Sequence, residues 1–70
     1  MILMNSEEYN YHPGLFLRDL ALVYYADLSR IKFDEYIVVI NDTAISSSEA
    51  EEWILRDNDR IFLVPKLDGG

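Results

Sequence analysis

The sequence contains no cysteine and only one histidine, His12. These absences exclude a disulfide, a thiolate metal site and a multi-histidine zinc site made by this chain alone. The chain also has no thiol that could act as a nucleophile. Because His12 has no cysteine partner, we expect it to be an exposed residue at a strand end and neither a catalytic group nor a metal ligand.

Basic residues and long apolar runs are also scarce. Six lysines and arginines face thirteen acidic residues, which gives a formal net charge of -7. Nucleic acid and anionic lipid are bound by clustered Lys and Arg, so we expect neither as a partner. The charge suits a basic protein partner, although solubility alone explains it equally well. The longest apolar run, residues 20–26, is too short to span a bilayer, and no signal peptide is evident, so we expect a cytoplasmic protein.

The length predicts one small domain that covers residues 1–70. A domain of this size hides only about 60% of its unfolded surface, so it has little stability to spare. Half of the residues are hydrophobic, which provides for a dense apolar core. No linker, internal repeat or low-complexity segment divides the chain.

The first half of the chain predicts a hairpin and a helix. Residues 1–4 and 8–12 flank turn residues 5–7 and form the hairpin. Pro13 and Gly14 then end it. From Leu17 on, apolar residues recur every three or four positions, as in a helix that packs one face on a sheet. The residues of this stripe after Leu17 are Leu20, Ala21, Tyr24 and Leu28.

Three further apolar residues of this helix, Leu22, Val23 and Tyr25, lie off the stripe. A short helix on one sheet buries a single face, so the other side needs a cover or stays exposed. We expect the connection at residues 31–36 to cover these side chains. A surface for a partner or for self-association is the alternative.

The middle of the chain predicts two strands and a short helical turn. Residues 36–40 are the most strand-like run and suit a strand with neighbours on both sides, and residues 43–45 pair back on it. Ser46 with Glu49, or Ser48 with Glu51, has the spacing of a capping box. We therefore interpret the three adjacent serines as a helix cap and not as a nucleophile. Residues 53–55 anchor this turn in the core.

The last fourteen residues, 57–70, combine a turn, a strand and a diglycine. Asn58 can adopt a left-handed conformation in the turn. Residues 60–64 form a strand, which Pro65 ends because proline has no N–H for a ladder. Gly69 and Gly70 then leave a slim end whose reactive group is the carboxylate, and we expect the segment after Leu67 to be solvated and mobile. A frayed end or a trimmed linker is the alternative interpretation.

This end resembles the ubiquitin-like sulfur carriers of the ThiS and MoaD kind, whose chains finish with a turn, an apolar strand, a short spacer and Gly-Gly. Residues 37–41 match an apolar strand that closes on Asn in that family. The family also has a glycine followed by the first turn of its helix, and a similar stretch is found here with Gly14, Leu17, Asp19 and Leu20. The chain departs from the family at Asn58, where Gly is usual, at Phe16, where a capping Thr or Ser is usual, and at Lys66 and Asp68, which bring charge into the spacer.

The order of elements is an α+β pattern. A crossover through the helix lets the first and last strands lie side by side in parallel. Other small α+β sheets would fit this order as well, and the resemblance selects among them. It implies a β-grasp (ubiquitin-like) fold, with a mixed sheet of four to five strands packed on one main helix.

The resemblance implies a sulfur carrier and not an enzyme. An adenylating, E1-like enzyme would use ATP to activate the carboxylate of Gly70, next to Gly69, and a thiocarboxylate would follow. The sulfur would go to thiazole synthase in thiamine biosynthesis or, as second choice, to the large subunit of molybdopterin synthase. No cofactor would be bound by the carrier itself. A ubiquitin-like modifier joined to lysines through Gly70 and a non-catalytic interaction domain are the alternatives.

Alternation along the last strand sends Ile61 and Leu63 to one face and Phe62 and Val64 to the other. We expect the first pair to face the helix and the second to begin a docking patch that leads to the tail. The expected partner-binding residues are Phe62, Val64, Pro65, Lys66, Leu67 and Asp68.

Overall fold

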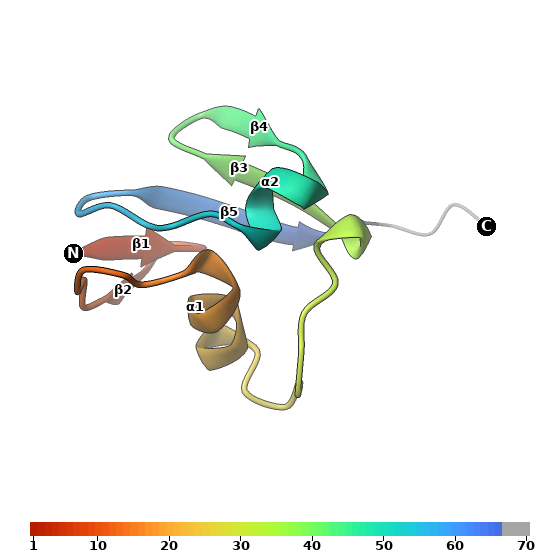
Figure 1. Ribbon diagram of the computed structural model, residues 1–70, viewed down its shortest axis with the longest axis horizontal. Helices are drawn as coiled ribbons and strands as arrows, with labels where there is room; N and C mark the ends of the chain where they lie inside the picture. The colour runs from red at the N-terminus through yellow and green to blue at the C-terminus, as the bar shows by residue number, and fades with distance from the viewer. Residues whose placement is uncertain (67–70) are drawn as a thin grey trace.

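The computed structural model describes residues 1–66 of the chain. Its elements are β1 (Ile2–Met4), β2 (Glu7–Tyr9), α1 (Leu17–Tyr24), the 3-10 turn η1 (Phe33–Glu35), β3 (Tyr36–Ile40), β4 (Thr43–Ile45), α2 (Ser47–Glu51) and β5 (Arg60–Pro65) (Figure 1). Within these residues the five strands form one sheet in the order β2-β1-β5-β3-β4. The pair β1–β5 is parallel and the other pairs are antiparallel. The expected α+β fold is confirmed as a mixed five-stranded, β-grasp-like sheet with one main helix.

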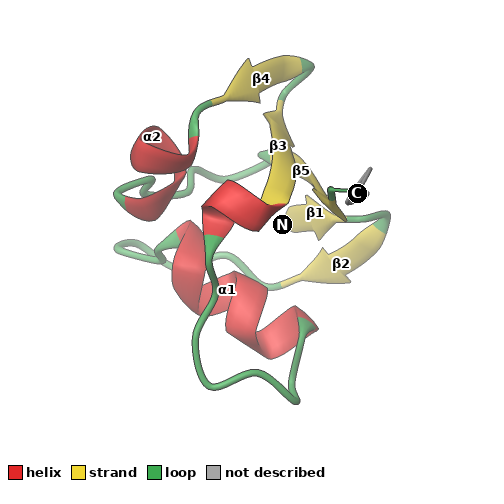
Figure 2. Cartoon of the chain, turned by 90° about the vertical axis from the view of Figure 1, so that its right-hand side faces the viewer, coloured by secondary structure: helices red, strands yellow, loops and turns green. Residues whose placement is uncertain are grey.

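Both helices lie on the same side of the sheet, as Figure 2 shows. Every second residue of β1, β3 and β5 points into the space beneath them, because side chains alternate along a strand. The buried apolar residues are Ile2, Met4, Val38, Ile40, Ile61 and Leu63 from the sheet and Leu15, Leu17, Leu20, Ala21, Phe33, Ala50 and Leu55 from the helical side. The sheet therefore has one face in the core and one open face.

Helix α1 is shorter than the apolar stripe predicts. Leu17, Leu20 and Ala21 are buried as expected, but the helix ends at Tyr24, so Leu28 lies beyond it and is exposed. Tyr25 has φ -100° and ψ 71° and leaves the helical path. Its hydroxyl reaches the sheet and donates a hydrogen bond to the Leu63 carbonyl. A contact with a distant strand therefore accompanies the end of the helix.

The start of α1 relies on neighbouring chain instead of a capping side chain. Phe16 occupies the N-cap position and makes no side-chain cap. The Leu17 N–H donates to the Trp53 carbonyl at 2.9 Å, and the Leu55 N–H donates to the Leu15 carbonyl at 2.8 Å. These two bonds form a short bridge that ties the helix start to the segment after α2.

The outer side of α1 is only partly covered. Leu22 is partly buried and lines a hollow with Ile31 and Phe33, and Tyr25 packs against Tyr36 with ring centroids 5.6 Å apart. The predicted cover by residues 31–36 is confirmed for these two side chains. It is wrong for Val23, which is 61% exposed and lines a hollow with Tyr9 and Leu15 instead of with residues 31–36.

Tight turns position the strands. Asn5 and Ser6 join β1 to β2, and Asn41 and Asp42 join β3 to β4, all four with φ between 49° and 70°. Two consecutive residues of positive φ give the hairpin turn whose twist matches that of the strands. Asn58 has φ 72°, so its predicted left-handed conformation is confirmed. The N-terminal hairpin is confirmed as well, but its second strand ends at Tyr9 and not at residue 12.

The short helix α2 is capped by Ser46. Its hydroxyl accepts a hydrogen bond from the Glu49 N–H at 3.3 Å, so the first of the two predicted caps is the one used. Leu55 is buried and Trp53 is partly buried, as an anchor requires. Ile54 is exposed, because it lies on the outer side of the bridge with Phe16, and the expectation that it helps to anchor the turn is wrong.

Candidate functional site

Strand β5 leads from the core to the predicted working end of the chain. It lies at the centre of the sheet, between β1 and β3. Ile61 and Leu63 are each 1% exposed, whereas Phe62 is 47% and Val64 49% exposed. The predicted facing of all four side chains is therefore confirmed.

The exposed side chains of β5 have apolar neighbours on β3. Phe62 pairs with Val39 and Val64 pairs with Ile37, and paired residues project from the same face of a sheet. Ile37 is exposed and Val39 is half-buried. We call Ile37, Val39, Phe62 and Val64 the open-face patch. Sequence reasoning identified only the β5 half, because residues 36–40 are apolar at every position and show no alternation.

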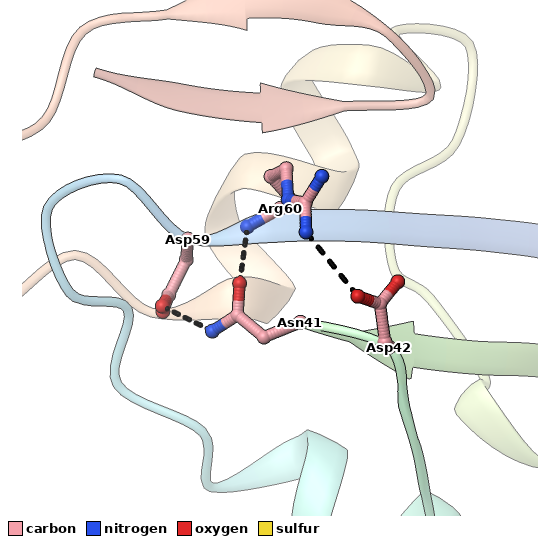
Figure 3. A network of polar contacts seen from close by, with 4 residues as sticks. All are labelled: Asn41, Asp42, Asp59 and Arg60. Atoms are coloured by element: carbon pink, nitrogen blue, oxygen red, sulfur yellow. Dashed lines mark hydrogen bonds and ion pairs between the residues drawn. The ribbon is translucent and has the colours of Figure 1, made fainter.

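A polar network fixes the start of β5 (Figure 3). The buried carboxylate of Asp59 accepts from the Asn41 side-chain amide at 2.9 Å and from the Arg56 N–H at 2.8 Å. The Asn41 amide oxygen in turn accepts from the Arg60 N–H at 3.0 Å. Both carboxylate oxygens of Asp59 are thus satisfied, which burial of a charged group requires.

One ion pair lies near this network. The Arg60 guanidinium and the Asp42 carboxylate are 3.3 Å apart, and both side chains are mostly exposed. An exposed pair of this kind contributes little to stability. The pair lies at the end of β5 that is remote from Pro65.

Strand β5 ends at Pro65 as predicted, although Pro65 is itself its last residue, one residue beyond the predicted range 60–64. Pro65 pairs with Tyr36, and the Lys66 N–H donates to the Glu35 carbonyl at 2.9 Å. The N–H and C=O groups of one residue point to one edge of a strand, and those of the next residue point to the opposite edge. Arg60 and Lys66 make their bonds toward β3, so the nitrogen of Pro65 faces the other edge, past the end of β1. No ladder bond is therefore lost there.

Two side chains hold Leu63 on that other edge. The Leu63 N–H donates to Asn5 Oδ1 at 2.9 Å, and its carbonyl accepts from Asn5 Nδ2 at 3.1 Å and from the Tyr25 hydroxyl at 3.2 Å. Burial raises the pKa of the Tyr25 phenol above its ordinary value, and Tyr36 and Tyr24 add smaller contributions. Sequence reasoning missed both side chains, because their partner is distant in the sequence.

The other expected partner-binding residues lie at the end of the chain. Pro65 and Lys66 are exposed beyond the open-face patch. Leu67, Asp68, Gly69 and Gly70 lie outside the described residues, and so do the predicted spacer contacts and the predicted mobility of the tail. Their roles stay predictions.

His12 is exposed as expected, in the loop after β2, with Nδ1 3.2 Å from the Pro13 carbonyl oxygen. Residues 1–66 contain no group of three or more histidine or acidic side chains placed to hold a metal ion.

Within residues 1–66, no helix combines the length and the apolar character needed to cross a membrane. Comparison of the whole chain with protein-family models, curated proteins and solved structures finds no match.

Proposed function

We propose that this chain is a cytoplasmic sulfur carrier, whose Gly70 carboxylate is adenylated and then converted to a thiocarboxylate. The observation that supports this most strongly is the placement of β5. This strand lies between β1 and β3, exposes Phe62 and Val64 on the open face, and stays hydrogen-bonded as far as Lys66. A hydrogen-bonded segment therefore leads to within four residues of Gly70.

The chemistry explains why such a carrier needs an activating enzyme. A carboxylate is a poor electrophile, because its negative charge repels nucleophiles. Transfer of AMP from ATP to the Gly70 carboxylate releases pyrophosphate and gives an acyl adenylate. A sulfide equivalent then displaces AMP and leaves the thiocarboxylate. Gly69 and Gly70 have no side chains, so a narrow enzyme channel can enclose their backbone.

The open-face patch is the proposed docking surface for the adenylating enzyme. Phe62 and Val64 belong to the strand that carries the tail, and Ile37 is also about half exposed. Contiguous exposed apolar side chains of this kind suit a protein interface. The net charge of -7 favours a basic surface around the complementary pocket of the enzyme.

Sulfur transfer needs a second partner. We place thiazole synthase of thiamine biosynthesis first and the large subunit of molybdopterin synthase second. The family resemblance described above supports both recipients. A cell-free assay with each purified synthase and the thiocarboxylated carrier would rank them by the product formed.

Mass spectrometry of the intact protein tests the proposed function. The chain is produced together with the adenylating enzyme and the sulfur source of the same organism. We expect a species in which one sulfur replaces one oxygen. The control is the chain without Gly69 and Gly70, which should keep its unmodified mass. A branched conjugate with lysines would indicate a protein modifier, and an unchanged mass of the full chain would contradict the proposal.

A further inference from the structure

The parallel ladder between β1 and β5 stops before β5 does. The Leu3 N–H donates to the Asp59 carbonyl at 3.0 Å, and the Asn5 N–H donates to the Ile61 carbonyl at 2.9 Å. The next residue of β5 whose backbone groups face β1 is Leu63. At that point Asn5, with φ 49°, has already turned the chain toward β2. The backbone of β1 therefore cannot form hydrogen bonds with the backbone of Leu63.

The side chain of Asn5 takes the place of the missing backbone. Its Oδ1 accepts from the Leu63 N–H, as the Asn5 carbonyl would in a continued strand. Its Nδ2 donates to the Leu63 carbonyl, as the N–H two residues later would. A primary amide has the same acceptor and donor as a peptide unit, so it can extend the ladder by one full step.

We propose that Asn5 is a positioning residue for the C-terminal segment. By completing the ladder at Leu63, it holds β5 in one direction as far as Lys66 and closes this edge to another chain. The inference rests on the proposed function, because it assigns the direction in which the tail meets the activating enzyme. Tyr25 supports Asn5 through its hydrogen bond to the same carbonyl.

Two physical arguments make the direction of β5 relevant. The seven residues from 64 to 70 span at most about 25 Å. If they are held extended in an enzyme channel, a change of about 10° at Leu63 moves the end by about 4 Å, and far smaller misplacements slow enzymatic reactions strongly. In addition, an unpaired Leu63 N–H would offer an open strand edge for pairing with a second chain.

Two substitutions separate positioning from the turn that Asn5 also forms. Asn5→Gly keeps the positive φ, which glycine adopts readily, but removes both bonds to Leu63. Asn5→Asp keeps an oxygen that can accept from the Leu63 N–H, but it replaces the donor with a negatively charged oxygen opposite the Leu63 carbonyl. The pair therefore tests the side-chain ladder with the hairpin turn preserved.

Amide hydrogen exchange, measured by NMR, is the first readout and needs no enzyme. We expect the exchange rate of Leu63, relative to that of Ile61, to rise about tenfold or more in Asn5→Gly and to stay near the wild-type ratio in Asn5→Asp. Equal acceleration at Leu63 and Ile61 would show that Asn5 supports only global stability, and it would overturn the inference.

Pyrophosphate exchange by the adenylating enzyme is the second readout. Asn5→Gly should lower kcat at least tenfold and leave the KM for the carrier within about twofold, because the open-face patch is intact. Phe62→Ala is the contrasting control and should raise KM. A wild-type kcat in Asn5→Gly would overturn the positioning role. If the wild-type carrier is itself not activated, the proposed function fails, and the amide exchange ratio still decides whether Asn5 orders β5.

Discussion

Replacement of Phe62 by alanine separates docking from folding on a single strand. The side chain of Phe62 is 47% exposed, whereas its neighbour Leu63 is 1% exposed. Full burial of a phenylalanine contributes about 1.5–3 kcal/mol, so loss of the half-buried Phe62 should cost about 1 kcal/mol of unfolding free energy. Leu63→Ala leaves a cavity in the core and should cost about 2–5 kcal/mol.

These costs matter because the domain is small. Its total stability should be about 3–5 kcal/mol, so Leu63→Ala should unfold much of the protein and Phe62→Ala should not. If Phe62 anchors the interface with the adenylating enzyme, its truncation should weaken docking by about 2 kcal/mol, which is a roughly 30-fold rise in KM. The strand itself thus supplies the matched control.

Urea denaturation and the KM for activation are the two measurements. We expect a small shift of the urea midpoint and a large rise of KM for Phe62→Ala. Unfolding comparable to that of Leu63→Ala would show that Phe62 belongs to the core. An unchanged KM in a folded variant would remove Phe62 from the docking surface.

Three further predictions concern the tail, the charge and the tyrosines. Deletion of Gly69 and Gly70 removes no residue of β5, so the Tm should be nearly unchanged while pyrophosphate exchange is lost; normal exchange would refute the terminal-carboxylate mechanism. With a net charge of -7, the association rate with the enzyme should fall as salt rises from low to physiological concentration, and a constant rate in stopped-flow measurements would exclude electrostatic steering. Burial raises the pKa of the Tyr25 phenol above its ordinary value of about 10, so its contribution to stability is present below that pH and is lost as pH rises through the higher folded value. Urea midpoints should therefore fall less steeply above about pH 10 in Tyr25→Phe than in the wild type, and equal slopes would contradict this linkage.

Local patterns predicted the parts of the fold that depend on local geometry. The facing of Ile61 and Phe62 follows from strict alternation in a strand, and the turn at Asn58 follows from its tolerance of positive φ. The parallel pairing of the first and last strands is also confirmed, but the order of elements only permits it, and the family resemblance was needed to select it.

The features that were missed depend on distant contacts. No glycine or proline marks the end of α1 after Tyr24, where Tyr25 reaches a carbonyl 38 residues away. Asn5 bonds Leu63 across 58 residues, and nothing near Asn5 in the sequence indicates more than a turn. The inward and outward residues of β3 were not separable, because the run from Tyr36 to Ile40 is apolar throughout.

The central place of β5 has a consequence for how the protein is made. The pair Leu3–Arg60 joins residues 57 positions apart, and β1 and β3 meet only through β5. A nascent chain that has not yet released residues 60–65 from the ribosome can pair β1 with β2 and β3 with β4, but the inner edges of β1 and β3 stay unpaired. Such edges invite pairing with other chains, and distant pairings form slowly. The sheet can close only after its middle strand has emerged, and that strand follows the other four in the chain.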